Sequence, residues 1–271
     1  MNESKVAIVT GASGGIGRAT AVALAGRGFA VVLAARNVPR LEETAELCRQ
    51  AGRQAGDRAV VVPTDVAVES QVQALVAGAV DRFGRLDVMV NNAGYGLFAP
   101  VQEITDRQMR DIFDVNYYGV FYGCKAAAPV MIRQQSGHIF NVSSVIGKRG
   151  APLHGAYCAT KFAVCGLTES LRVELAPRGV RVTCVCPALT ETDFFSRSLV
   201  ARRAESTFNR YARKMPPAAV GRKIAACVGQ SRPQIVFTAG GKFLVVLSAL
   251  WPRAADALMR VYYADLARLL K

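Results

Sequence analysis

The segment KVAIVTGASGGIGRAT, residues 5–20, places a glycine-rich turn between an apolar strand and the start of a helix. Gly11, Gly15 and Gly17 leave room for the backbone to approach a pyrophosphate, and the N-terminus of a helix favours the negative charge of such a group. The wider gap comes first, unlike the order G-x-G-x-x-G, and a purely structural turn is the alternative. At a first strand–helix junction, the pattern predicts a dinucleotide site.

The rest of the chain repeats this alternation of strand and helix. Short β-branched runs are separated by segments long enough for helices, which predicts βαβ units with right-handed crossovers. The expected fold class is α/β, a Rossmann-like doubly wound parallel sheet of about seven strands with helices on both faces. The expected strands are 5–10, 30–35, 59–64, 86–92, 138–143, 180–187 and 234–238, and the expected helices are 16–27, 40–51, 68–83, 105–133 and 156–176.

Length and composition are typical of a globular protein with a substantial core, since the 271 residues are 51% hydrophobic and 20% charged. No repeat or low-complexity linker divides the chain, so we expect one domain over 1–240 and a helical extension over 241–271 that packs on it. The first residues, MNESKVAIVT, contain no secretory signal and predict a cytoplasmic protein. The seven cysteines form no C-x-x-C pair and there are two histidines, which predicts reduced thiols and no metal site.

A second chemical signal is HGAYCATKF, residues 154–162, in which Tyr157 and Lys161 are four positions apart. Residues at this spacing share one face of a helix, about 5–6 Å apart. A cation at roughly 5 Å favours the tyrosinate by roughly 3 kcal/mol, or about two pKa units, at an effective dielectric of about 20. Such a phenol can serve as a general acid or base near neutral pH. A pair at this spacing also arises by chance, so it indicates catalysis only in company with other motifs.

Further motifs follow one another along the chain in a fixed order. Together with the glycine turn and the Tyr157–Lys161 pair, they make the chain resemble the short-chain dehydrogenase/reductase family from residue 5 to about residue 238. Several spaced motifs in one order are far more specific than any one of them alone. These further motifs are Asp65 with Val66, NNAG at 91–94, Asn116, Ser144 thirteen residues before Tyr157, and PALTET at 187–192.

The resemblance implies an enzyme that transfers hydride to or from a nicotinamide cofactor. Tyr157 is expected to exchange a proton with the substrate oxygen, and Ser144 to hydrogen-bond that oxygen. Lys161 is expected to lower the pKa of Tyr157 and to hold the nicotinamide ribose. Asn116 is expected to kink its helix and hold a water that links Lys161 to solvent. Ser143 is the rival for the serine role, although the spacing to the tyrosine favours Ser144.

The family's cofactor contacts map onto the glycine turn, the ends of the second to fourth strands, the catalytic pair and the loop after the sixth strand. The residues expected to contact the cofactor are Gly11, Ser13, Gly15, Ile16, Gly17, Arg36, Asp65, Val66, Asn92, Ala93, Gly94, Tyr157, Lys161, Pro187 and Thr192.

The end of the second strand bears on the choice of cofactor. Relatives that prefer NAD usually carry an acidic residue there, whereas this chain has Ala35 followed by Arg36. A guanidinium can bind a 2′-phosphate through paired hydrogen bonds, so we expect NADP rather than NAD. Gly14 departs from the pattern, because many NADP-using relatives have a second basic residue at that place. An ordinary surface charge is the alternative reading of Arg36.

The net charge of +14 is concentrated near the C-terminus, since residues 1–196 carry 20 basic and 17 acidic side chains and residues 197–271 carry 14 and 3. A lid expected at about 188–220 contains much of this basic charge. The apolar run 243–251 is far short of a bilayer span, and an amphipathic helix is expected after Pro252. We expect its apolar stripe to cover the core, a partner subunit or the substrate cleft. A peripheral membrane contact or an anionic carrier-bound substrate is the alternative, and nucleic-acid binding is not expected.

These features predict an NADP-dependent carbonyl reductase or alcohol dehydrogenase whose small-molecule substrate is a hydrophobic ketone or an acyl-type compound. The alternatives are a membrane-docked lipid reductase and a cofactor-binding regulatory or scaffold protein without turnover. The resemblance also implies a homodimer or homotetramer that pairs through 105–133 and 156–176.

Overall fold

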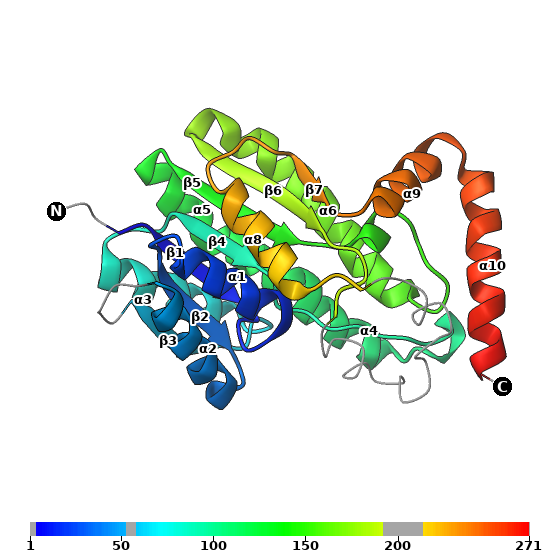
Figure 1. The fold of residues 1–271 in the computed structure, drawn as a ribbon, viewed down its shortest axis with the longest axis horizontal. Coiled ribbons are helices and arrows are strands. Elements are labelled where there is room, and N and C mark those ends of the chain that lie inside the picture. The colour runs from blue at the N-terminus through cyan, green and yellow to red at the C-terminus, as the bar shows by residue number, and fades with distance from the viewer. Residues whose placement is uncertain (1–3, 53–57, 192–213, 271) are drawn as a thin grey trace.

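The structure, a computed structural model, describes residues 4–52, 58–191 and 214–270, without the side chains of 265–270. Its centre is a seven-stranded parallel sheet in the order β3-β2-β1-β4-β5-β6-β7 (Figure 1). The predicted sheet is confirmed, with strand ends within about two residues of those expected. The strands are β1 (Val6–Thr10), β2 (Ala30–Ala35), β3 (Ala59–Pro63), β4 (Val88–Asn91), β5 (Gly137–Val142), β6 (Val180–Cys186) and β7 (Gln234–Val236).

Alternating side chains of the central strands supply two hydrophobic cores, because successive residues of a strand point to opposite faces. Val9 and Leu33 lie in the core on one face, whereas Ile8 and Val32 lie in the core on the other. Both faces are therefore buried and need helices to cover them.

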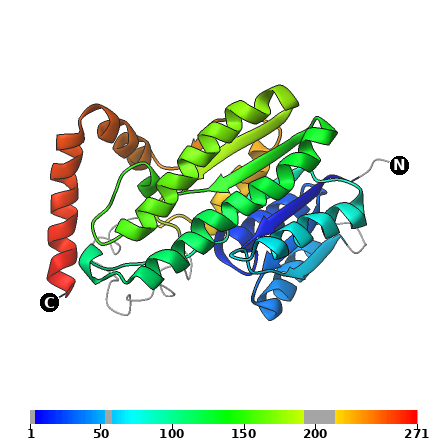
Figure 2. The same cartoon turned by 180° about the vertical axis from the view of Figure 1, so that it is seen from behind.

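Among the described residues, helices cover both faces of the sheet, as Figures 1 and 2 show from opposite sides. One layer contains α1 (Gly15–Ala25), α2 (Val38–Ala51) and α8 (Pro217–Cys227). The opposite layer contains α3 (Glu69–Phe83), α5 (Gly119–Gln134) and α6 (Gly155–Leu175). The short 3-10 helices are η1 (Val101–Glu103), η3 (Val145–Gly147) and η4 (Ala176–Arg178).

The helix expected over 105–133 is present, but its hydrogen bonding changes part-way along. It begins as α4 (Asp106–Phe113), where Thr105 and Gln108 form a capping box. A π-helical turn, η2 (Asp114–Tyr118), follows and leads directly into α5. Such turns insert an extra residue and are frequent at functional sites.

The carboxyl ends of all seven strands lie at one edge of the sheet, because all the strands are parallel. The strand order reverses between β1 and β4, where successive crossovers leave in opposite directions. Ligands of doubly wound sheets bind in the crevice at such a point. The glycine turn after β1 and the segment 92–94 after β4 both lie there.

The extension forms two helices, α9 (Ala239–Leu250) and α10 (Pro252–Leu270), at the end of the molecule opposite the N-terminus (Figure 1). Tyr262 of α10 packs against Phe98 and Leu153, and Asp256 pairs with Arg149. The predicted packing of the extension on the domain thus has a physical basis in these contacts. No helix among the described residues has the length and apolar character needed to cross a bilayer.

Much of α9 faces outward. The exposed fractions of Phe243, Val246, Leu250 and Trp251 lie between 53% and 62%. A peripheral membrane contact through these side chains stays a prediction.

The lid expected at about 188–220 falls mainly on residues 192–213, which lie outside the described residues. Its last part is a different structure, because Pro217–Val220 begin α8 and Val220 is fully buried. Here Gly221 lies against α1, and a Cβ at this position would come within 2.5 Å of the Ala19 carbonyl.

We predict that Gly221→Ala destabilises the protein by roughly 1–3 kcal/mol, because the new methyl group forces α8 away from the backbone of α1. Gly78→Ala is the matched control, since Gly78 lies in a helix with nothing within 4 Å of its added Cβ. The control is expected to raise the free energy of unfolding by about 0.5–1 kcal/mol. Urea unfolding measures both, and a Gly221→Ala variant as stable as the control would contradict this packing.

Candidate active site

The glycine turn after β1 depends on close backbone approach. Gly11 has a φ of +66°, and a Cβ on Gly17 would lie 2.2 Å from the Gly11 carbonyl oxygen. Any side chain at Gly17 therefore clashes with the turn itself. Gly14, the N-cap of α1, makes no side-chain capping bond, and the first turn of α1 contains no acidic residue. Ser13 and Ile16 flank this helix N-terminus, which suits an anionic group.

Thr10 joins the glycine turn to the segment after β4. Its Oγ1 accepts hydrogen bonds from the backbone N–H groups of Asn92 (3.0 Å) and Ala93 (3.1 Å). In return, Asn92 Nδ2 donates to the Thr10 carbonyl at 2.9 Å. The two sides of the crevice are thus fixed relative to each other.

Asn116 lies fully buried in the π-helical turn. Its side chain forms two hydrogen bonds with the backbone of Tyr95, accepting from N–H and donating to C=O, both at 2.9 Å. A Cβ on Gly94 would lie 2.9 Å from Asn116 Oδ1 and 3.5 Å from Lys161 Nζ. Gly94, Asn116 and Lys161 therefore meet at one point.

Tyr157 and Lys161 lie on the first turns of α6 with both side chains buried. The Lys161 Nζ lies 5.6 Å from the centroid of the Tyr157 ring and donates to the Val142 carbonyl at 2.9 Å. The hydroxyl of Ser144, just after β5, hydrogen-bonds the Tyr157 side chain. The structure thus brings together the phenol, the ammonium and the serine.

Burial is the main cause of the pKa shifts of both Tyr157 and Lys161. It raises the pKa of Tyr157, and the hydrogen bond with Ser144 acts in the opposite direction. Burial also lowers the pKa of Lys161 to about 8. The pKa of Tyr157 therefore lies above its ordinary value, contrary to the lowering by Lys161 that the sequence predicted, and burial is the main cause.

Ser143 and Ser144 are neighbours with different environments. Ser143 Oγ donates to the Lys161 carbonyl at 2.8 Å and lies 3.3 Å from Cys165 Sγ. Ser143 therefore ties the end of β5 to the backbone of α6, whereas Ser144 is half-buried and hydrogen-bonds the phenol of Tyr157. This arrangement agrees with the choice of Ser144 over Ser143 made from the spacing.

Three of the residues expected to contact the cofactor, Arg36, Asp65 and Val66, lie after β2 and β3. The Arg36 side chain is 73% exposed, and its Nη1 lies 3.7 Å from Asp65 Oδ2. Val66 is buried, and its Cγ2 would lie 2.8 Å from a Cβ on Gly119. The proximity of Asp65 to Arg36 could not be foreseen from positions so far apart in the sequence.

The loop after β6 approaches the same edge. The Pro187 carbonyl accepts from the N–H of Val145, the residue after Ser144, at 3.0 Å. Thr192, also expected to contact the cofactor, lies outside the described residues.

An apolar group with one imidazole borders α6 at its N-terminus. His154 lies three residues before Tyr157 and meets the ring of Phe98 edge-on, with ring centroids 5.0 Å apart. Burial lowers the pKa of His154 to about 4, so the imidazole is neutral at physiological pH. Leu153 and Tyr262 of α10 complete the group. The extension therefore reaches the segment just before Tyr157.

Comparison with known proteins agrees with this geometry. The family model described as short chain dehydrogenase matches residues 5–202. The chain belongs to the short-chain dehydrogenase family.

Relatives within the family are oxidoreductases. A diacetyl reductase [(S)-acetoin forming] from Staphylococcus epidermidis is 39% identical over 195 residues, 72% of this chain and 74% of its own. A family member from Burkholderia phymatum, solved with NAD, has a TM-score of 0.82 and 31% identity, covering 92% of this chain and 95% of its own. A variant of the actinorhodin polyketide ketoreductase, solved with NADPH, has a TM-score of 0.78 and 30% identity, covering 89% and 98%. This short-chain dehydrogenase is therefore a nucleotide-dependent oxidoreductase of carbonyl and alcohol groups.

The site of this short-chain dehydrogenase fits a nicotinamide nucleotide on steric grounds. Added Cβ atoms on Gly11, Gly17 and Gly94 would collide with neighbouring protein atoms, so these glycines let the turn after β1 pack closely against the segment after β4 at the crevice. The uncapped N-terminus of α1 is suited to the phosphates, and Lys161 and Tyr157 lie where the nicotinamide ribose is expected.

Two positioning residues were missed by sequence reasoning. Thr10 precedes the glycine turn, and a threonine at the end of an otherwise apolar strand was a usable signal. Tyr95 holds Asn116 through its backbone, which leaves no trace in residue type.

We predict that Lys161→Met raises the free energy of unfolding at pH 7 by roughly 1–3 kcal/mol, because it removes a buried charge. The gain should shrink as pH rises from about 8 towards 10.5, the pKa range between folded and unfolded Lys161. In that range the folded lysine becomes neutral while the unfolded one stays protonated, so wild-type stability rises with pH.

Urea unfolding at pH 7 and pH 10 measures this difference. Lys125→Met is the control, because the Lys125 side chain is 55% exposed, and we expect it to change stability by less than about 0.5 kcal/mol. A stability gain for Lys161→Met that grows with pH would contradict the buried charge.

Proposed function

We propose that the chain is an NADP-dependent reductase of hydrophobic carbonyl compounds in which Tyr157 supplies the proton. The observation that carries this proposal is the meeting of Tyr157, Ser144 and Lys161 beside the crevice at the strand-order reversal. When bound, the nicotinamide supplies or accepts the hydride. The family and the intact site favour an enzyme over a regulatory protein without turnover.

The protein's part is to hold the carbonyl and move one proton. Ser144 and Tyr157 donate hydrogen bonds to the carbonyl oxygen, which orients the substrate and stabilises the charge that develops there. The phenol then gives its proton to this oxygen. A cationic Lys161 nearby makes the resulting tyrosinate less costly than burial alone would allow.

Reloading of Tyr157 needs a path for protons. Asn116 interrupts the helix with a π-turn and holds the backbone of Tyr95, beside the point where Gly94 and Lys161 meet. We assign Asn116 a positioning role: the turn leaves a place for water that passes a proton towards Lys161.

Two features support NADP as the cofactor. Ala35 stands where a carboxylate would bind the ribose hydroxyls of NAD, and the neighbouring Arg36 is exposed. Asp65 Oδ2 lies 3.7 Å from Nη1 of Arg36. The other N–H groups of the Arg36 guanidinium can therefore still donate to a phosphate. Solved relatives include complexes with NADPH and with NAD, so the support comes from this chain's own residues.

A hydrophobic substrate is supported by the group beside His154. Phe98 and Leu153 are buried against Tyr262 next to His154, so the segment just before the catalytic tyrosine is apolar, and its imidazole is uncharged at physiological pH. The name of the Staphylococcus relative gives a small diketone, diacetyl, as the substrate of that protein. For this chain we propose α-dicarbonyl compounds that carry larger apolar groups.

Pairing of two or four copies through 105–133 and 156–176 stays a prediction. Tyr118, Phe162 and Val173 on these helices are 42%, 45% and 72% exposed, which supports contact with a second copy.

We predict that Ser144→Ala lowers kcat for carbonyl reduction by about 10²–10³-fold, because the developing oxyanion loses a donor. Ser143→Ala is the matched control one residue away, expected to keep turnover within about tenfold because the buried Ser143 hydroxyl is bonded to the Lys161 carbonyl and faces Cys165 rather than Tyr157. The assay follows NADPH absorbance with a panel of ketones that includes diacetyl. Equal loss in both variants, or loss in Ser143→Ala alone, would contradict the proposed catalytic serine.

We predict that Arg36→Ala weakens NADPH binding by about 10–100-fold and leaves NADH binding within about threefold, because a charge-assisted bond to the 2′-phosphate is worth about 1.5–3 kcal/mol. Fluorescence titration with each nucleotide measures this. Arg27→Ala removes the same charge from an exposed position at the far end of α1 and should change neither affinity. Equal weakening of NADH and NADPH by Arg36→Ala would overturn the NADP assignment.

A further inference from the structure

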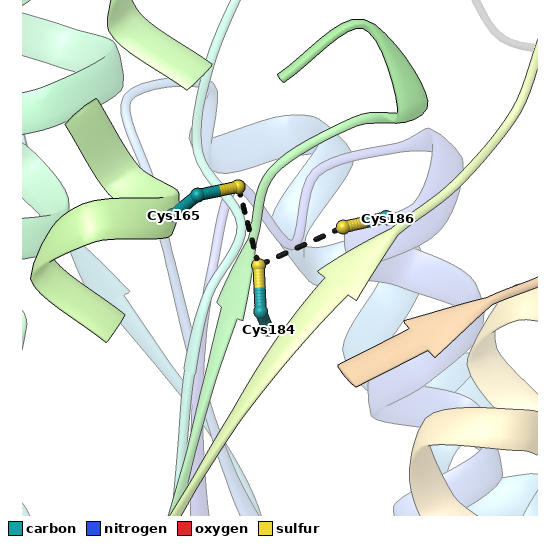
Figure 3. Close-up of side chains that lie close together, drawn as sticks. All are labelled: Cys165, Cys184 and Cys186. Atoms are coloured by element: carbon teal, nitrogen blue, oxygen red, sulfur yellow. Dashed lines mark hydrogen bonds between the residues drawn. The ribbon is translucent and has the colours of Figure 1, made fainter. Parts of the chain in front are cut away.

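Three cysteines that are scattered in the sequence meet beneath the catalytic residues. Cys184 and Cys186 lie two residues apart on β6 and so point to the same face, which α6 covers with Cys165 (Figure 3). The Cys184 sulfur is 3.6 Å from each of the other two sulfurs, and all three lie within 4.8 Å of one another. All three are free thiols and buried, with exposed fractions of 4% or less. The sequence, which contains no C-x-x-C pair, did not predict this group of three thiols.

The spacing of the sulfurs suits a single metal ion. Three sulfurs bound to one ion at about 2.3 Å lie roughly 3.8–4.0 Å apart, close to the distances found here. The elements that hold them are a central strand and a long helix, so the donors are already positioned. Hydrogen bonds among the thiols, together with burial, raise the pKa of Cys184 and of Cys186, so binding of a metal has to release protons from these thiols.

The number and softness of the donors decide between ions. Structural zinc sites almost always have four ligands, whereas the described residues place three sulfurs together and no histidine or carboxylate with them. Thiolates also select Cu⁺ among the available soft ions. We propose that Cys165, Cys184 and Cys186 form a three-coordinate binding site for Cu⁺.

The position of the cluster couples it to the active site. Tyr157, Lys161 and Cys165 follow at intervals of four along one face of α6. Ser143 Oγ bridges Cys165 Sγ and the Lys161 carbonyl, at 3.3 Å and 2.8 Å. An ion that draws the three sulfurs together therefore pulls on the helix turn that carries Lys161. We therefore expect bound Cu⁺ to lower the rate of carbonyl reduction, an expectation that rests on the proposed function.

The side of the cysteine cluster that faces β7 offers a route by which an ion can enter. Val236, which is half-buried at the end of β7, packs against the three sulfurs, and α9 begins three residues later. We expect Cu⁺ to enter on this side by displacing one aliphatic side chain.

Transfer of Cu⁺ from its coloured bicinchoninate complex, under anaerobic conditions, tests the site without any need for turnover. We expect reduced wild-type protein to withdraw one equivalent of Cu⁺, and Cys184→Ala and Cys165→Ala to withdraw none. Cys227→Ala and Cys48→Ala are matched controls, because both thiols are buried in the core on the other face of the sheet, and they should bind like wild type. NADPH titration identifies which variants are folded.

Failure of wild type to withdraw Cu⁺ would overturn the site, as would wild-type withdrawal by a folded Cys184→Ala or Cys165→Ala variant. In the second arm, Cu⁺-loaded wild type should reduce ketones at least about fivefold more slowly, with the folded Cys184→Ala variant insensitive to Cu⁺. Unchanged turnover of the loaded protein would overturn the coupling. If the copper-free protein reduces no carbonyl compound, the proposed function is contradicted. The metal site is then tested by the Cu⁺ transfer experiment alone, because that experiment does not depend on turnover.

Discussion

Burial of the central strands on both faces is the constraint from which the site follows. Because Val9 and Leu33 face one core and Ile8 and Val32 the other, each strand needs a helical crossover and all strands run parallel. Parallel strands bring their carboxyl ends to one edge, where the glycine turn, the Asn92–Gly94 segment, Ser144 and Pro187 then meet although they are far apart in sequence. The catalytic groups are thus placed by the same pattern that builds the core.

Charge burial is the cost of this arrangement. Lys161 lies almost wholly out of water, and its pKa falls to about 8, so at pH 7 the fold retains an ammonium that burial disfavours. The Val142 carbonyl, which accepts a hydrogen bond from the ammonium, offsets part of that cost. Natural proteins often give up stability at functional sites in this way. The same helix face continues to Cys165, which connects the buried charge to the thiol cluster.

How much the sequence predicts depends on whether a feature is local. Strand ends were found within about two residues because glycines and strand-length apolar runs mark them, and the catalytic residues because they follow one another at fixed spacings. The missed features are tertiary. Val220 and Ile224, four apart, were a usable helical signal for α8, but its packing on α1 shows only in the fold. The Arg36–Asp65 pair and the sulfur cluster depend on which elements become neighbours, whereas an interruption of the helix at Asn116 was expected from the family resemblance.

Proton transfer by Tyr157 is tested most directly by single-turnover oxidation of NADPH with an excess of a reactive ketone, in wild type and Tyr157→Phe. Nucleotide titration first establishes that both proteins bind NADPH with affinities within about fivefold. Because phenylalanine keeps the ring and removes the proton, we expect the rate in the variant to fall by at least roughly 10²-fold. A Tyr157→Phe variant that oxidises NADPH near the wild-type rate would contradict the assignment of the proton donor, and with it the roles given to Ser144 and Lys161.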